Sequence, residues 1–203
     1  MDTPRTNAMA ADPMGLALAE AAAAGARGEV PVGAVVLGPD GAVLASAGNE
    51  TEARADASAH AELLALRAAA AARGVARLPD CDLVVTLEPC PMCAQAASLF
   101  RIRRLVFAAY DPKGGGVEHG ARVFAAPSCH HRPEVVGGVR EQEAQVLLRG
   151  FFAARRGCAP ALPTGAVPSG VVSGETPRVT RRPARRGAPG RSDPAVPVDP
   201  AHP

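Results

Sequence analysis

Cysteine, histidine and glutamate residues at two places in this chain have the types and the spacing to do chemistry. Cys90 and Cys93 lie three positions apart in the run TLEPCPMC, and upstream His60 and Glu62 flank a single alanine. Thiolates and imidazole are ligands that zinc prefers, and three protein ligands leave a fourth position open for water, as in catalytic zinc sites. The residues therefore predict one catalytic zinc ion per chain, held by His60, Cys90 and Cys93.

The cysteine pair is expected at a junction between a strand and a helix. The apolar run 83–87 is typical of a buried strand. Pro89 ends that run, and Pro91 suits the first turn of a helix, where its missing N–H costs nothing. Free N–H groups and the positive end of the dipole at a helix start favour thiolates, the form of cysteine that binds metals.

His60 is expected in the first turn of a second helix. Ser58 suits the N-cap position, and the run of alanine and leucine that follows continues to Arg73 and is closed by Gly74. Two helix starts would then meet and share one ion.

Glu62 is expected to move protons rather than to bind the metal. Residues two apart on a helix do not share a face, so Glu62 is poorly placed as a second ligand beside His60, although it can lean over the open position. Water activated by such a zinc ion can attack an electrophilic carbon, and a mobile carboxylate can carry its proton to the leaving group. Glu88 is the second candidate for this role, but we expect it to accept backbone hydrogen bonds near the start of the helix.

Each half of this pattern has a common alternative explanation. A lone CxxC at a strand–helix junction also fits a redox pair, and a lone His-Ala-Glu is most often helix surface. Together and in this order, each at a helix start, H-x-E and P-C-x-x-C are the signature of zinc-dependent nucleobase deaminases. Glu62 and the lack of a fourth protein ligand argue against a structural zinc or redox module.

From Glu29 to about Arg156 the chain resembles the bacterial tRNA-specific adenosine deaminases. The resemblance rests on the following motifs: Glu29-Val-Pro-Val-Gly-Ala34, Asn49 with eleven residues from there to His60, His60-Ala-Glu62, Thr86-Leu-Glu-Pro-Cys-Pro-Met-Cys93, Tyr110-Asp-Pro-Lys-Gly-Gly115, and Phe151-Phe152 near the end of a helix. The family usually continues its glycine loop into a small Gly-Ser segment, which Gly116-Val-Glu-His-Gly120 replaces in this chain.

This resemblance implies a cytoplasmic homodimer that converts the wobble adenosine of an anticodon, that of an arginine tRNA, to inosine. It implies zinc on the three ligands above and Glu62 as the proton shuttle. It also implies that Asn49 bonds the flipped base and that Glu29, Val32 and Asp111 line the nucleotide pocket. Lys113, the only lysine, and Tyr110, the only tyrosine, flank Asp111 and add weight to a site there.

The alternative within the enzyme class is a deaminase of a free base or nucleotide, such as guanine, cytosine or deoxycytidylate. H-x-E and PCxxC do not separate these substrates. Asn49, the Asp111 loop and the long C-terminal helix favour RNA.

The elements alternate as in a layered α/β domain. We expect a cytidine-deaminase-like three-layer fold, with a mixed sheet of about five strands and helices on both faces. The expected helices are 12–24, 58–73, 90–100 and 140–156, and the expected strands are 32–37, 42–47, 83–87, 104–109 and 133–139, with a hairpin turn at 38–41 and a long loop over 110–131.

Composition divides the chain into a loose N-terminus at 1–11, a deaminase domain at 12–157 and a tail at 158–203. The tail contains ten of the twenty prolines and carries a net charge of +3, and we expect it to be disordered. The remainder has a charge of −1, so affinity for RNA would come from shape and a local patch. Five cysteines, an odd number, argue against a disulfide framework and for a reducing compartment.

Two further segments were weighed and set aside. The Ser128-Cys-His-His131 cluster has the composition of a second metal site, but it lacks a spaced partner and is expected to be loop. The apolar stretch 14–26 is interrupted by Glu20, which argues against a signal peptide, and no run is long enough to span a membrane.

Overall fold

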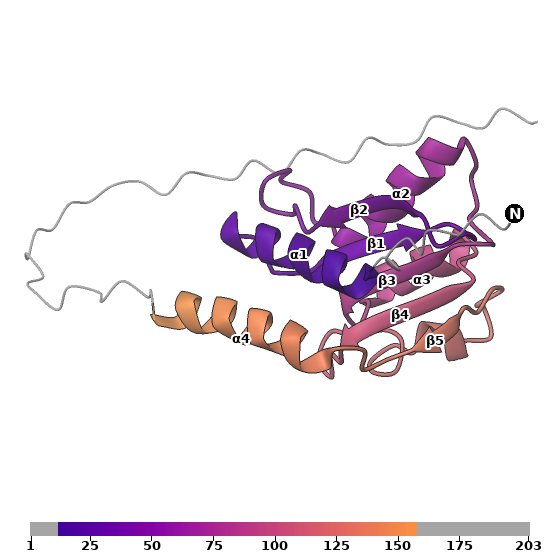
Figure 1. Ribbon diagram of the computed structural model, residues 1–203. Coiled ribbons are helices and arrows are strands. Elements are labelled where there is room, and N and C mark those ends of the chain that lie inside the picture. The colour runs from indigo at the N-terminus through magenta and orange to yellow at the C-terminus, as the bar shows by residue number, and fades with distance from the viewer. Residues whose placement is uncertain (1–11, 158–203) are drawn as a thin grey trace, which may run out of the picture. The chain divides into compact units, whose positions relative to one another are not determined.

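The computed structural model describes residues 12–157. The predictions for 1–11 and 158–203 lie outside this range. Within it, a mixed five-stranded sheet has the order β2-β1-β3-β4-β5 (Figure 1). Strand β1 is antiparallel to both β2 and β3, whereas β3, β4 and β5 run parallel. The strands are β1 (Gly33–Leu37), β2 (Val43–Gly48), β3 (Asp82–Leu87), β4 (Arg104–Ala109) and β5 (Glu134–Val136).

Helices cover both faces of this sheet, two on each (Figure 1). One face carries α1 (Pro13–Ala26) and α4 (Glu141–Gly157), and the other carries α2 (Ala61–Arg73) and α3 (Pro91–Leu99). Strand residues alternate between the two layers: Val35 packs with Met14 and Leu18 of α1, while Val36 packs with Leu66 of α2. The predicted three-layer architecture is confirmed.

Two helix boundaries differ by two residues from the sequence-based expectation, and the last strand, β5, covers only Glu134–Val136 instead of 133–139. Gly25 does not end α1, which continues to Ala26 and is followed by Gly28 in the left-handed conformation at φ 87°. Ser58 does not cap α2, because its hydroxyl and N–H both donate to the carboxylate of Asp56. The helix therefore begins two residues later, with His60 itself at the N-cap.

The strand directions gather several chain segments at one edge of the sheet. In the parallel pair β3–β4, Leu87 lies opposite Ala109, so the segments beginning at Glu88 and at Tyr110 leave the sheet side by side. The antiparallel register pairs Gly33 at the start of β1 with Gly48 at the end of β2, which brings Val32 and Asn49 to the same edge. Every predicted site segment therefore starts from this edge.

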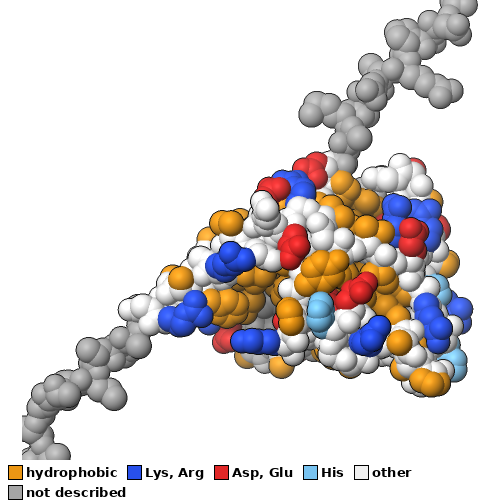
Figure 2. Space-filling model, turned by 90° about the horizontal axis from the view of Figure 1, so that it is seen from below, with side chains coloured by type: hydrophobic (Ala, Val, Ile, Leu, Met, Phe, Trp, Pro, Cys, Tyr) orange, Lys and Arg blue, Asp and Glu red, His pale blue; other side chains and the backbone are white. Residues whose placement is uncertain are grey.

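The 110–133 connection contains one short 3-10 helix, Val123–Ala125. Figure 2 views the molecule from the side of α4 and β5, where hydrophobic side chains gather in the middle with charged side chains of both signs around them. Val146 and Phe152 of α4 are 67% and 43% exposed, so much of this helix faces solvent. No helix within the described range is both long and apolar enough to cross a bilayer.

Candidate active site

The starts of α2 and α3 bring His60, Cys90 and Cys93 together. His60 is the N-cap of α2 and Cys90 the N-cap of α3, while Cys93 lies in the first turn of α3. His60 Nδ1 is 3.6 Å from the Sγ atom of each cysteine. Among residues 12–157 this is the one group of three or more potential ligands that converge within 4.8 Å.

These distances fit a tetrahedral zinc ion. Bonds of about 2.3 Å to sulfur and about 2.05 Å to nitrogen, meeting at the tetrahedral angle, hold their ends about 3.6 Å apart. The observed separations of 3.6 Å match that value for both cysteines. Three donors of these types in this arrangement are therefore suited to hold zinc and to leave a fourth position open.

The protonation of the cluster also suits a metal. The hydrogen bond from the Cys93 thiol, the nearby His60 and the backbone N–H at the helix start together lower the pKa of Cys90 to about 4. The same hydrogen bond and burial raise the pKa of Cys93. The lowered pKa favours the thiolate form of Cys90, which is the form that binds a metal.

Glu62 lies beside the ligands although it is two residues from His60 in sequence. Because His60 precedes the helix as its cap, the rule for faces within a helix does not separate the two side chains. Glu62 is only 4% exposed and lines the same cavity as His60 and Cys90. Burial raises the pKa of its carboxyl group, which suits a group that accepts and returns a proton near neutral pH.

The cavity above the cluster has a volume of about 240 Å³. It is lined by Val30, Val32, Asn49, Thr51, His60, Glu62, Leu87, Glu88, Cys90, Asp111 and Gly114. Val32, Asn49 and Asp111 thus line the cavity that also contains His60, Glu62 and Cys90. Sequence reasoning missed Val30, Thr51 and Leu87, although each lies within two residues of a predicted position.

Glu29 was expected in the pocket wall, but it lies behind Asn49. Its carboxylate accepts hydrogen bonds from the N–H groups of Ala53 and Glu52 and from the Thr51 hydroxyl. The hydrogen bond from Ala53 is the largest cause of its lowered pKa, which burial opposes. A carboxylate accepts only, so the 3.5 Å contact to Asn49 must come from the amide nitrogen, and Glu29 thereby fixes the orientation of that amide.

Lys113 does not line the cavity of about 240 Å³ above the cluster, which we call the inner cavity. It borders a neighbouring cavity of about 620 Å³ that shares Asp111 and Leu87 with the inner one and extends to Phe152 of α4. Asp111 is both wall and turn residue, because its carboxylate accepts the N–H groups of Lys113 and Gly114. The turn chemistry and the pocket position are thus compatible.

Glu88 makes hydrogen bonds that differ from those expected. It does not bond the start of α3; its carboxylate accepts N–H groups from the 111–119 loop, those of Asp111, Val117, Glu118 and His119. These partners are 23 to 31 residues away in sequence, so a local sequence pattern does not predict these hydrogen bonds.

The Ser128–His131 segment is loop, as expected, and Cys129 and His131 contact residues at and just after the end of α3. The Ser98 hydroxyl donates to the His131 carbonyl and lies 3.4 Å from Cys129 Sγ, while His131 Nε2 bonds the Ile102 carbonyl at 2.7 Å. These contacts tie the loop to the end of α3.

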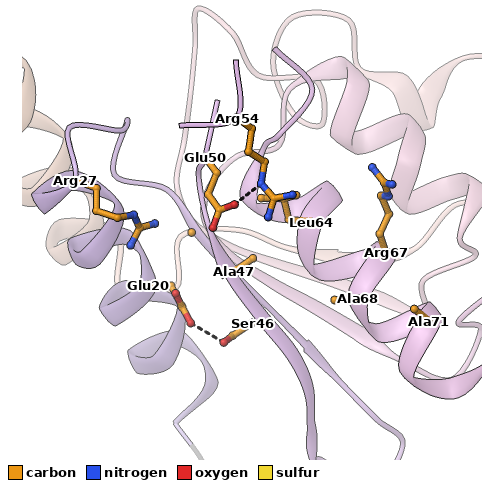
Figure 3. Close-up of a pocket in the computed structure, with 11 residues that line it drawn as sticks. Glu20, Arg27, Ser46, Ala47, Glu50, Arg54, Leu64, Arg67, Ala68 and Ala71 are labelled. Atoms are coloured by element: carbon orange, nitrogen blue, oxygen red, sulfur yellow. Dashed lines mark hydrogen bonds and ion pairs between the residues drawn. The ribbon is translucent and has the colours of Figure 1, made fainter. Parts of the chain in front are cut away.

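A separate cavity of about 580 Å³ lies beside β2 between α1 and α2 (Figure 3). Glu20 accepts the Ser46 hydroxyl and Glu50 pairs with Arg54, while the floor is made by small or apolar side chains such as Ala47 and Leu64. Its described lining contains neither histidine nor cysteine, so the metal chemistry belongs to the other cavity.

Comparison with known proteins supports this assignment of the chemistry. Residues 9–109 match the family model for the cytidine and deoxycytidylate deaminase zinc-binding region. A tRNA-specific adenosine deaminase of Agrobacterium fabrum is 54% identical over 143 residues, which cover 70% of this chain and 93% of the relative. The chain belongs to the tRNA-specific adenosine deaminases.

Solved structures of the tRNA-specific adenosine deaminases and their neighbours agree with the fold. A structure from studies of A-to-I editing by tRNA:A34 deaminases at the wobble position of transfer RNA is 54% identical, with a TM-score of 0.66, and covers 67% of this chain and 98% of that one. A guanine deaminase from Nitrosomonas europaea is 27% identical with a TM-score of 0.62, and covers 71% of this chain and 86% of its own. The cytidine-deaminase-like fold is confirmed, and with it membership of a zinc-binding deaminase family.

Proposed function

We propose that this protein hydrolyses the wobble adenosine of a tRNA anticodon loop to inosine and releases ammonia. The observation that carries the proposal is the convergence of His60, Cys90 and Cys93 with a buried glutamate in one small cavity, in a chain that belongs to this family. The arginine tRNA is the substrate we propose to test first.

His60, Cys90 and Cys93 would hold the zinc ion, one per chain. When bound, zinc activates water for attack at neutral pH. The proton balance then falls to Glu62, whose carboxylate takes a proton from the attacking water and gives it to the ring nitrogen beside the reacting carbon. Glu62 then carries the second proton, taken from the hydroxyl group now on that carbon, to the exocyclic amine. The carbon–nitrogen bond breaks, the carbonyl group of inosine forms, and the amine leaves as ammonia.

Asn49 and Asp111 are the proposed substrate contacts. The Asn49 amide nitrogen is directed to Thr51 and Glu29, so the amide oxygen is the atom that we assign to a donor on the purine edge. A cavity of about 240 Å³ suits a single base, so the target must be unpaired or extruded from its stack. Asp111 and Lys113, at the boundary with the larger cavity, would contact the flanking nucleotides.

The homodimer and the cytoplasmic location remain part of the proposal. Met92 and Leu99 of α3 are 37% and 66% exposed, which supplies apolar surface for a partner copy. Sedimentation of the purified protein at several concentrations tests the dimer. The four cysteines of the described range are all free, as a reducing compartment requires.

The test is product analysis on competing substrates. The enzyme is incubated with an arginine-tRNA anticodon stem-loop that carries a wobble adenosine and, in parallel, with free adenine, adenosine, guanine, cytosine and deoxycytidylate. We expect inosine in the stem-loop alone, and less of it with Asn49→Ala or Asp111→Ala at unchanged zinc content. Efficient turnover of a free base with the stem-loop untouched would assign the protein to the metabolic deaminases instead.

A further inference from the structure

One buried carboxylate holds most of the loop that walls the substrate cavity. Glu88 is 2% exposed, and its two oxygens have different partners. Oε1 accepts the N–H groups of Val117, Glu118 and His119 at 3.2, 2.8 and 2.9 Å. Oε2 accepts the N–H of Asp111 at 3.0 Å and the ring N–H at Nδ1 of His119 at 2.8 Å.

The loop approaches this carboxylate more closely than a side chain would permit. A Cβ atom on Gly115 would lie 2.6 Å from the carboxyl carbon of Glu88 and 2.5 Å from the carbonyl oxygen of Asp111. Both distances are shorter than van der Waals contact allows, so glycine is required at this position. The close packing of the loop on Glu88 therefore depends on the glycine at position 115.

His119 connects Glu88 to a residue of the neighbouring cavity of about 620 Å³, which we call the outer cavity. Its ring meets the edge of Tyr110 with centroids 5.9 Å apart, and Tyr110 in turn meets Phe107 of the buried sheet at 5.1 Å. Tyr110 and Asp111 both line the outer cavity. Glu88 and His119 thus reach two wall residues without lining the outer cavity themselves.

We propose that Glu88 and His119 are positioning residues for the substrate, acting through Asp111 and Tyr110 on the nucleotides that flank the reacting base. The proposal rests on the function proposed above and adds to it how the recognition wall is fixed. His119 belongs to the same 111–119 loop as the backbone N–H groups that Glu88 accepts. Neither residue is one of the proposed zinc ligands or the proposed proton shuttle.

The near-isosteric substitution Glu88→Gln tests the roles of the two Glu88 oxygens separately. In Glu88→Gln the amide oxygen retains the three N–H groups of Val117, Glu118 and His119. The amide NH₂ then replaces Oε2 and meets the N–H of Asp111, donor against donor. We expect faster hydrogen exchange at the Asp111 amide, while the amides of Val117 and Glu118 stay protected.

Kinetics on the stem-loop distinguish positioning from a purely structural role. We expect Glu88→Gln to raise KM about tenfold while kcat changes less than about twofold, because binding by the wall is lost and the chemistry is not. Zinc content should stay at one per chain. The matched control is Glu118→Gln, which makes the same change on an exposed side chain of the same loop and should leave KM unchanged.

Two variants of His119 provide an independent test if Glu88→Gln does not fold. His119→Ala removes both the bond to Glu88 and the contact with Tyr110, and it should raise KM for the stem-loop. His119→Asn places an amide N–H near the position of Nδ1 and should restore most of the affinity. Because His119 is partly exposed, both variants are expected to fold.

Wild-type KM values in both Glu88→Gln and His119→Ala would overturn the proposal, as would a loss of zinc together with kcat. A failure of the proposed function gives a different result, since the wild-type enzyme would then leave the stem-loop unchanged. Hydrogen exchange at Asp111 still reports in that case whether Glu88 holds the loop.

Discussion

Glu62 and Glu88 line the same cavity and are almost equally buried, yet their surroundings are opposite. Burial raises the pKa of Glu62, and few hydrogen bonds relieve it. Burial also raises the pKa of Glu88, but the N–H groups of His119 and Asp111 outweigh it and lower the pKa overall. Glu88 is surrounded by N–H donors and suits an anchor, whereas Glu62 has few such donors and suits proton transfer.

The largest effect is expected when one of the proposed metal ligands is removed. Cys93→Ala removes one of three ligands and should abolish both bound zinc and turnover. The loop around Glu88 should stay ordered, because its hydrogen bonds do not involve the ligands. Elemental analysis and hydrogen exchange on one sample check both statements, and a stoichiometric metal content would reject this ligand set.

Glu62→Gln tests the reactive member of the pair. Kcat should fall about 10²–10⁴-fold because the amide cannot shuttle a proton, while zinc remains bound. Thermal stability should not fall, since a neutral amide is cheaper to bury than a carboxylate with few partners. Loss of zinc in this variant would show that Glu62 is a ligand, and a stable inactive protein with zinc sharpens the contrast with Glu88.

Glu88→Gln should have the opposite profile in stability. The amide opposes one N–H donor and weakens charge-assisted bonds to three others, which is expected to cost about 1–3 kcal/mol of unfolding free energy. Urea unfolding of wild type, Glu88→Gln and Glu62→Gln side by side measures the difference. Equal stability of the two variants would mean that the anchor role is wrong.

The smallest effect concerns pH and a third buried glutamate. Hydrogen bonds, that from Ala53 first, lower the pKa of Glu29 below its ordinary value of 4.5. A lowered carboxyl pKa contributes stability that is present above the unfolded-state value and is lost as the pH falls through the folded-state value. The gap in urea midpoint between wild type and Glu29→Gln should therefore be widest at neutral pH and close below about pH 4.5.

Because wild type and Glu29→Gln have the same candidate metal ligands, any effect of acid on metal binding is expected to cancel in their difference, which then reports on Glu29. Glu118→Gln, whose side chain is exposed, should show no such gap. A gap that widens towards acid would reverse the sign and exclude Glu29 as an anchor of the Asn49 loop.

The sequence predicts the fold and the reacting groups well because their signals are local. Alternating apolar runs, Pro91 at a helix start and Gly74 at a helix end are each read within a few residues, and Gly74 is indeed left-handed at φ 64°. Ser58 shows where this fails: a neighbouring Asp56 captures its hydroxyl, so the better capping residue by type does not cap. Such competition between two polar neighbours is not visible in a pattern.

The substrate wall is less predictable because its contacts are distant in sequence. Asn49, Val32 and Asp111 were placed by resemblance and lie in the cavity. The position of Glu29 behind the wall and the bonds of Glu88 to residues 111–119 depend on how far-apart loops pack. Only the geometry of the folded chain shows that Glu29 lies behind the wall and that Glu88, which lines the cavity, also holds the 111–119 loop.

The convergence of chain segments at one sheet edge has a consequence for how this enzyme can change over evolution or in engineering. The reacting groups come from the starts of α2 and α3, while much of the wall comes from the single connection between β4 and β5. Loops tolerate changes of length and sequence better than the sheet and helices that carry them, apart from positions such as Gly115 that the contact with Glu88 restricts. We therefore expect that exchange of residues 110–133 as one segment, with Glu88 retained to bind it, is the simplest way to give this deaminase a different nucleic-acid substrate.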